Sequence, residues 1–172
     1  MIDFKNQTLD LEDLPRFENV EGHPVDRAYL KVLRILYIFW SIVFFLGFFI
    51  LDYFVEIPQL AFYSILIVLT LIFLLSIVDI EMGFNRRKFG IRDLDIIFQK
   101  GFFVFNQTIV PYKRIQHVEI RQGLVFKAFK LYTLKIYTAG SSAGDLSIAG
   151  LNQLDADKLK AQILKVADLD EN

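Results

Sequence analysis

Residues 35–78 read ILYIFWSIVFFLGFFILDYFVEIPQLAFYSILIVLTLIFLLSIV, and this stretch decides the class of the protein. It holds two apolar runs without a charge, 35–51 and 57–78, of 17 and 22 residues. A helix that crosses the hydrocarbon core needs roughly 17–25 such residues, and soluble core helices rarely stay uncharged for so long. In lipid each run must pair its own backbone groups, which favours helix. The sequence therefore predicts a transmembrane helical hairpin, with helices at about 32–51 and 57–78.

Basic residues flank only one end of this hairpin. Arg27, Lys31 and Arg34 precede the first run, and the second is followed by Arg86, Arg87, Lys88 and Arg92. The link between the runs carries Asp52 and Glu56 but no Lys or Arg. Because Lys and Arg favour the cytoplasmic side, the sequence predicts a multi-pass membrane protein with both termini cytoplasmic.

The interior of the hairpin offers no site for transport or catalysis. Phenylalanines recur around Gly47, at Phe44, Phe45, Phe48 and Phe49, a spacing typical of lipid contact and packing against the partner helix. No ionisable residue lies in the middle of either run, which argues against an ion path or proton relay. Asp79 and Glu81, at the inner end, are expected to pair locally with the nearby Arg86 and Arg87.

The parts on either side of the hairpin (27–84) differ in charge. Residues 1–26 form an acidic arm. Its first 25 residues hold six acidic and two basic side chains. We expect this N-terminal cytoplasmic arm either to dock on the domain or on a partner, or to be disordered. Residues 85–172 are long enough for one small domain and carry fourteen basic against nine acidic residues.

Short alternating segments follow the hairpin and predict β-strands. They lie near 89–91, 95–98, 102–105, 108–112, 115–121, 131–139 and 145–151, with loops at 99–101 and 140–144. In 115–121, Ile115, Val118 and Ile120 can share a face only if a β-bulge intervenes. From Asn152 the period changes to that of a helix, about 153–167, with Leu159, Ile163 and Val166 on one side. The sequence therefore predicts a small all-β sandwich or barrel with a C-terminal capping helix.

Several of these segments resemble a known family. The stretch FGIRDLDIIFQKG (89–101), then VPYKRIQHV (110–118), Gln122-Gly123, Leu131, TAG (138–140) and IAGL (148–151) resemble the bacterial pleckstrin-homology-like, membrane-flanked domain family. The resemblance extends from about Arg27 to Leu164 and includes the hairpin. It implies two antiparallel sheets with seven strands, a C-terminal helix and a bacterial inner-membrane location, but no defined activity. At Phe129-Lys130-Leu131 the family often has Phe-Gly-Leu.

The residue types needed for catalysis are sparse. The chain has no cysteine, which excludes disulfides and thiolate chemistry. Its two histidines, His23 and His117, lack the spacing of a metal site, and neither a nucleophile elbow nor a phosphate-binding loop occurs. The sequence thus predicts no cofactor, no metal and no enzymatic activity.

A cluster of basic residues is the candidate binding site. The residues selected for lipid headgroups or a partner are Arg86, Arg87, Lys88, Lys113, Arg114, His117 and Arg121. The first three are the first basic residues after the second apolar run, where each cation is worth on the order of 1 kcal/mol against an anionic leaflet. They can equally serve only as topology signals, and the others can be a solvated face.

Three hypotheses about function follow. The leading one is a membrane-anchored, non-enzymatic interaction module that binds a protein partner and, as a second ligand, anionic lipid headgroups at the cytoplasmic face. The first alternative is a structural subunit of an envelope complex assembled through the helices, by way of Gly47, Ala61 and Ser64. The second alternative is a membrane enzyme using His117. The expected partners are the bilayer and either another protein or further copies of the chain, but not nucleic acid.

The predicted orientation has a direct test. A reporter fused after Asn172 is expected to be active on the cytoplasmic side, because both basic flanks lie at the same end of the hairpin. The matched fusion, inserted in the acidic link at 52–56, should report from the opposite side. A periplasmic signal from the fusion after Asn172 would contradict this topology.

Overall fold

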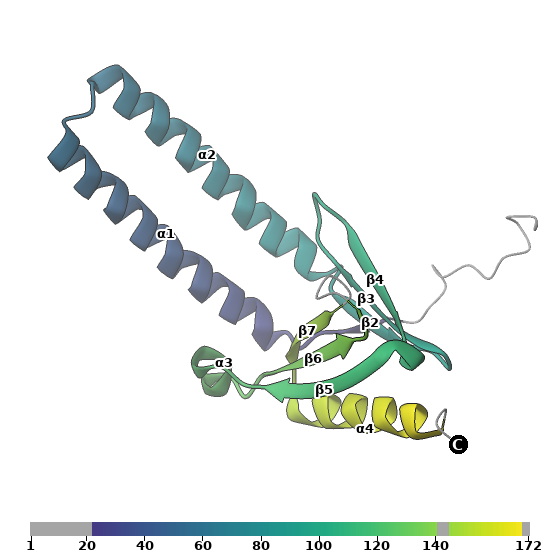
Figure 1. Cartoon of the computed structure of the whole chain (residues 1–172). Helices are drawn as coiled ribbons and strands as arrows, with labels where there is room; N and C mark the ends of the chain where they lie inside the picture. The colour runs from purple at the N-terminus through teal and green to yellow at the C-terminus, as the bar shows by residue number, and fades with distance from the viewer. Residues whose placement is uncertain (1–21, 141–144, 170–172) are drawn as a thin grey trace, which may run out of the picture.

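The structure is a computed structural model, and it describes residues 22–140 and 145–169. Most of the expected acidic arm, and residues 141–144 of the expected loop, lie outside the described residues. The described part has two long helices, two β-sheets and a C-terminal helix (Figure 1). The expected fold class is therefore confirmed.

The two long helices are α1 (Ala28–Val55) and α2 (Gln59–Phe84). Both meet the requirements of a membrane span in length and hydropathy, and only 6% and 0% of their most apolar windows are buried within the protein. A core helix of a soluble protein would bury most of such a window. Each helix is longer than its apolar run: the 28 residues of α1 extend about 42 Å against a hydrocarbon core of about 30 Å. Most of the excess lies at the end nearest the domain, in residues 28–34 of α1 and 79–84 of α2.

Aromatic side chains hold the two helices together. The rings of Phe44 and Phe45 lie 5.6 and 5.1 Å from that of Phe73, and Phe48 stacks on Phe62 at 5.2 Å. These are centroid separations at which aromatic pairs attract. The expected packing of these phenylalanines against the partner helix is confirmed.

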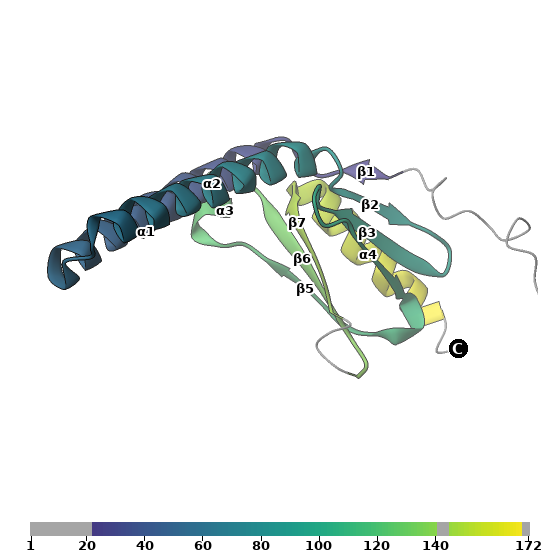
Figure 2. The same ribbon diagram turned by 90° about the horizontal axis from the view of Figure 1, so that it is seen from above.

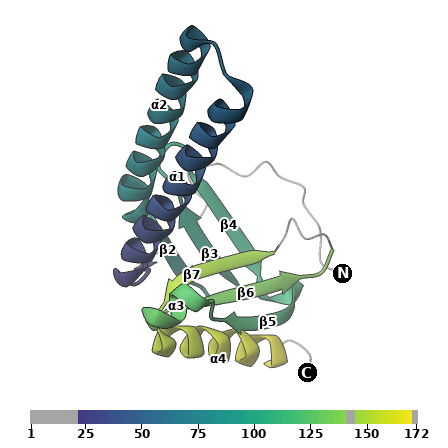
Figure 3. The ribbon, with the colours of Figure 1, turned by 90° about the vertical axis from the view of Figure 1, so that its left-hand side faces the viewer.

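The domain contains two antiparallel sheets that lie between the hairpin and the C-terminal helix (Figure 3). The first has the strand order β1 (His23–Pro24), β2 (Lys88–Ile91), β3 (Asp95–Lys100), β4 (Asn106–Pro111). The second has the order β5 (Ile115–Arg121), β6 (Tyr132–Thr138), β7 (Leu146–Leu151). A 3-10 helix, η2 (Tyr112–Arg114), connects the sheets.

Strand β1 comes from the segment before the hairpin. His23 pairs with Phe89 and Pro24 with Lys88, so the hairpin is inserted between the first and second strands of a sheet (Figure 2). The domain expected at 85–172 therefore also includes residues that were assigned to the arm at 1–26. Two residues are too few to show an alternating pattern, and their partners lie more than sixty positions away.

The strand pattern between β3 and β6 was predicted in part. The bulge expected in 115–121 is present as a register shift between Ile115 and His117. The strand expected at 102–105 was wrong, because these residues form the loop between β3 and β4. The short helix α3 (Leu124–Ala128) was not anticipated.

The C-terminal helix α4 (Gln153–Leu169) begins and packs as the sequence indicates. The Asn152 side chain accepts a hydrogen bond from the Asp155 N–H at 2.8 Å and donates one to the Asp155 carboxylate, also at 2.8 Å. These reciprocal bonds satisfy groups that a helix start leaves unpaired. Leu159 and Ile163 are 2% and 1% exposed, and they cover the open end of the sheets.

The base of the hairpin is part of the domain core. Val25, Tyr29, Val32 and Phe84 belong to the same buried cluster as the sheet and α4 side chains. Gly150, in β7, has a φ of +84°, and a Cβ placed on it would lie 2.4 Å from the Tyr29 ring. The ring therefore lies directly on the backbone of β7, and only glycine allows this contact.

The backbone conformation of Lys130 explains why the family often has a glycine at this position. Its φ is +54°, in the left-handed region where a side chain costs about 1–2 kcal/mol. The family's glycine adopts this conformation freely. Here a lysine adopts this conformation in the turn after α3.

These two left-handed positions should respond oppositely to substitution. Gly150→Ala is expected to lower the free energy of unfolding by about 2–4 kcal/mol, because it adds backbone strain and a clash with Tyr29. Lys130→Gly should raise it by up to about 1 kcal/mol. Thermal unfolding of the full chain in detergent measures both. Gly123→Ala is the control, since Gly123 has a φ of −77° and no atoms near the added Cβ. Equal shifts for all three variants would contradict the assignment.

Candidate functional site

The seven predicted site residues fall in three separate places. Arg86, Arg87 and Lys88 lie where α2 meets β2. Two more, Lys113 and Arg114, lie in η2, which follows the end of β4 farthest from the β3–β4 loop. The others, His117 and Arg121, lie in β5. The structure thus does not bring them together into one basic patch.

The junction of α2 and β2 is the part nearest the membrane-spanning helices. The Arg86 guanidinium lies 4.9 Å from the centre of the Phe102 ring, and that of Arg87 lies 5.6 Å from the centre of the Tyr29 ring. Both distances are within the range of cation–π attraction. Nε of Arg87 is buried and has no hydrogen-bond partner among the described residues. Lys88 is exposed.

Strand β5 carries a small polar network on the outer face of its sheet. Arg121 Nε donates to Glu119 at 2.7 Å, and the Tyr137 hydroxyl lies 3.2 Å from both side chains. The hydrogen bond from Arg121 lowers the pKa of the Glu119 carboxyl, and loss of water raises the pKa of the Tyr137 phenol. The exposed His117 ring lies 5.7 Å from that of Tyr137. This arrangement is an ion pair on an open sheet rather than an enclosed pocket, and no group of three metal-binding side chains occurs in the described ranges.

A second cluster, which the sequence did not reveal, joins α2 to the loop between β3 and β4. We call this loop, residues 101–105, the β3–β4 tip. Oδ1 of Asp79 accepts hydrogen bonds from the N–H groups of Phe102 and Phe103 at 3.2 and 3.1 Å. One turn further along α2, Gly83 is so close to the tip that an added Cβ would lie 3.2 Å from the Phe102 nitrogen. The only signal in the sequence is that Asp79 and Gly83 are four residues apart, and so share one face of the helix.

The acidic residues at this end of α2 do not pair with the arginines that were expected. Glu81 forms a two-pronged ion pair with Arg34 of α1, with N–O distances of 2.5 and 2.6 Å. Asp79 binds backbone amides instead. The expectation was wrong because Glu81 faces the other helix of the hairpin, forty-seven positions earlier in the chain.

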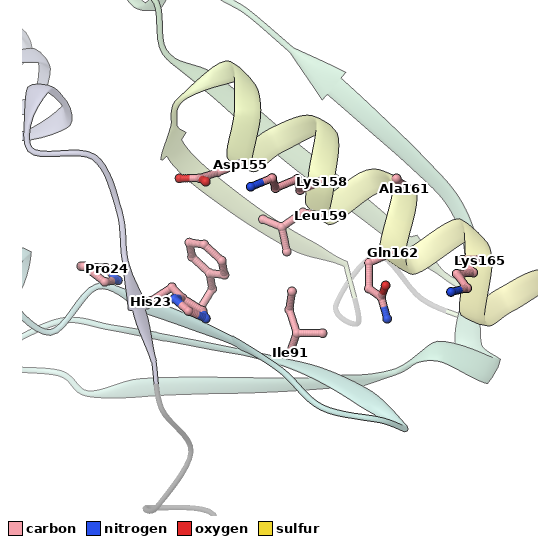
Figure 4. Close-up of a pocket in the computed structure, with 10 residues that line it drawn as sticks. His23, Pro24, Ile91, Asp155, Lys158, Leu159, Ala161, Gln162 and Lys165 are labelled. Atoms are coloured by element: carbon pink, nitrogen blue, oxygen red, sulfur yellow. The ribbon is translucent and has the colours of Figure 1, made fainter.

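A groove lies between the first sheet and α4 (Figure 4). Its volume is about 730 Å³, and Phe89, Ile91 and Leu159 provide apolar surface. Polar side chains from β1 and α4 complete the lining: His23, Asp155, Lys158, Gln162 and Lys165. Lys158, Gln162 and Lys165 have the spacing of one helix face.

The role of Asp79 can be tested on the tip itself. Asp79→Ala removes an acceptor that holds two amides, so the tip should open more often, and hydrogen exchange of residues 101–105 should rise roughly tenfold. Asp79→Asn keeps an acceptor oxygen and should stay close to the wild type. The measurement is hydrogen exchange of the full chain in detergent, with β6 as an internal reference. Equal exchange in all three proteins would show that Asp79 does not position the tip.

The comparisons with known proteins agree with this architecture. The chain is similar to a UPF0699 transmembrane protein, YdbS, of Bacillus subtilis (strain 168), with 36% identity over 80 residues. This alignment covers 46% of the chain, and the chain spans about half (48%) of that relative's length. No solved structure gives a significant match.

A family model describes a larger part of the molecule. The model named bacterial PH domain matches residues 33–167, which include most of the hairpin, both sheets from β2 onward and nearly all of α4. These elements are the ones that form the core with the base of the hairpin. The chain therefore belongs to the bacterial PH domain family.

Proposed function

We propose that this protein is a membrane-anchored, non-enzymatic interaction module, whose PH-like domain binds a protein partner at the membrane surface. The observation that carries the proposal is the packing of the hairpin base into the domain core, through Tyr29 and Val32. A domain fixed in this way presents the same face to the surroundings at all times. A partner that binds a rigidly held domain loses less conformational entropy than one that binds a domain on a flexible linker.

The groove beside α4 is the proposed docking site. Helix α4 lies on the side of the sheets away from the apolar hairpin, so a partner can reach it without entering the membrane (Figure 1). The groove combines the exposed apolar side chain of Ile91, above the buried Phe89 and Leu159, with the amines of Lys158 and Lys165. This combination fits an extended peptide segment with apolar side chains flanked by carboxylates.

The orientation and the basic junction complete the proposal. We place both termini on the cytoplasmic face of the bacterial inner membrane, in keeping with the basic flanks of the hairpin. Arg86, Arg87 and Lys88 then face an anionic leaflet, where each contributes on the order of 1 kcal/mol. Lys113 and Arg114, at the other end of β4, are assigned to the partner rather than to lipid.

A second candidate function uses the helices instead of the domain. Gly47, Ala61 and Ser64 are exposed on the surface of the hairpin, and a Cβ on Gly47 would meet no atom within 4 Å. Small exposed residues allow close approach of another transmembrane helix. This observation favours a subunit of a membrane complex as the alternative.

The groove is tested by reversing one charge in it. Lys158→Glu is expected to weaken partner binding about tenfold or more, because it places a like charge against the carboxylates of the peptide. Lys160→Glu, on the same helix but outside the groove, makes the same charge change and should bind like the wild type. A photo-cross-linking residue at Gln162 in the full chain, in membranes, identifies the bound protein by mass spectrometry.

Three outcomes separate the candidates. A cross-linked partner that is lost in Lys158→Glu and kept in Lys160→Glu supports the groove. Equal recovery from both variants contradicts it. A partner that is insensitive to both lysines but lost in Gly47→Phe would instead favour assembly through the helices.

A further inference from the structure

The β3–β4 tip exposes large apolar side chains. Phe103, Val104 and Phe105 are 56%, 69% and 53% exposed, and they are consecutive in a loop that would ordinarily be polar. Gly101 allows the turn, because its φ is +95° and a Cβ there would lie 2.0 Å from the Val104 carbonyl oxygen. A contiguous apolar surface of this kind indicates a contact with something other than water.

The position of the tip along α2 is fixed by three contacts. Asp79 binds its amides, Gly83 lies against its backbone and Arg86 lies over the Phe102 ring. Asp79 is also the first charged residue after the apolar run that ends at residue 78. The tip is therefore held at the level where the hydrocarbon core of the bilayer begins.

Phe103 reaches past this level, toward the middle of the span. It lines a hollow of about 440 Å³ together with side chains of α2: Ile72, Leu75, Ser76, Asp79 and Ile80. Leu75 lies one turn, or about 6 Å, further into the apolar run than Asp79. Ile72 and Leu75 are 52% and 50% exposed, so this is the lipid-facing surface of the helix. The ring of Phe103 is thus continuous with a surface that the bilayer already covers.

Cationic groups lie next to the apolar side chains of the tip. A second hollow, of about 310 Å³, is lined by Arg87 and Lys100 together with Asp79, Gly101, Phe103, Val104 and Asn106. Oδ1 of Asp79 already accepts two backbone hydrogen bonds, and the buried Nε of Arg87 has no partner among the described residues. Two cations beside exposed aromatic rings match a phospholipid, with its phosphate next to its acyl chains.

We propose that the β3–β4 tip is a membrane anchor in addition to the two helices. Phe103, Val104 and Phe105 insert into the interfacial layer of the leaflet at the domain's end of the hairpin, and Arg87 and Lys100 face the phosphates of anionic phospholipids. Phenyl rings are favoured at this depth because burial of each removes apolar surface from water. The anchor is separate from the partner groove and does not depend on either terminus being cytoplasmic.

Spin labels on the full chain test this insertion. The absence of cysteine allows single labels at Val68, Leu94 and Val104, all exposed, in liposomes of phosphatidylethanolamine and phosphatidylglycerol. Val68 is in the middle of α2, and Leu94 lies in the turn between β2 and β3, at the opposite end of β3 from the tip. Accessibility to oxygen, relative to a water-soluble nickel chelate, reports depth in the bilayer. We expect the ratio at Val104 to be several-fold above that at Leu94 and below that at Val68.

Each other outcome overturns the proposal in a recognisable way. A label at Val104 that is as accessible to nickel as the one at Leu94 means that the tip is in water. If neither reagent reaches Val104, protein covers the tip, either a partner or a second copy. An aqueous label at Val68 would show that the hairpin does not span the bilayer, and the anchor would fail with it. The partner groove is unaffected by the first two results.

Discussion

The contact between Tyr29 and Gly150 is the interaction on which the position of every surface depends. The Tyr29 ring lies on the β7 backbone, and the carbonyl of Gly150 accepts a hydrogen bond from the Asp26 N–H at 2.8 Å. Helix α1 begins two residues after Asp26 and runs without a break to Val55. Because a continuous helix transmits the direction of its first turn, packing in the domain core sets the direction of the span. The domain is therefore not suspended on a linker.

The second helix is attached to the domain at a different place. Asp79 and Gly83 hold the β3–β4 tip, while Arg34 and Glu81 join the two helices at the same level. The first sheet is thus connected to the end of α2, and the second sheet to the start of α1. Any rotation of the domain against the hairpin would have to break both attachments, including two amides that would lose their acceptor near the lipid. Two separate attachments explain why one face of the domain lies against the base of the hairpin and α4 faces away from it (Figure 3).

The sequence predicted those features that local patterns determine. The length of the apolar runs, the break in alternation that marks the bulge near Ile115, and the helical spacing of Leu159 and Ile163 can each be recognised within a single element. Features that depend on pairing with distant residues were not predictable. Strand β1 has only two residues, and Glu81 pairs with Arg34 rather than with the nearby Arg86 and Arg87. At the candidate site, adjacency in sequence was a poor guide, since the seven basic residues occupy three places. The groove lysines, Lys158 and Lys165, have the same charge and spacing as solvated ones, and only the position of β2 distinguishes them.

The error at residues 102–105 is the most informative one. A run of apolar residues indicates that water is excluded, but it does not indicate by what. Between two strands of a soluble domain, the excluding medium is normally the core, which is why the run resembled a strand. In this chain the bilayer around α2, next to the tip, is a second apolar medium. In water, leaving the half-exposed Phe103 and Phe105 uncovered forgoes on the order of 1 kcal/mol each, a notable amount for a small domain. Lipid at the end of α2 removes that cost without requiring any place in the core.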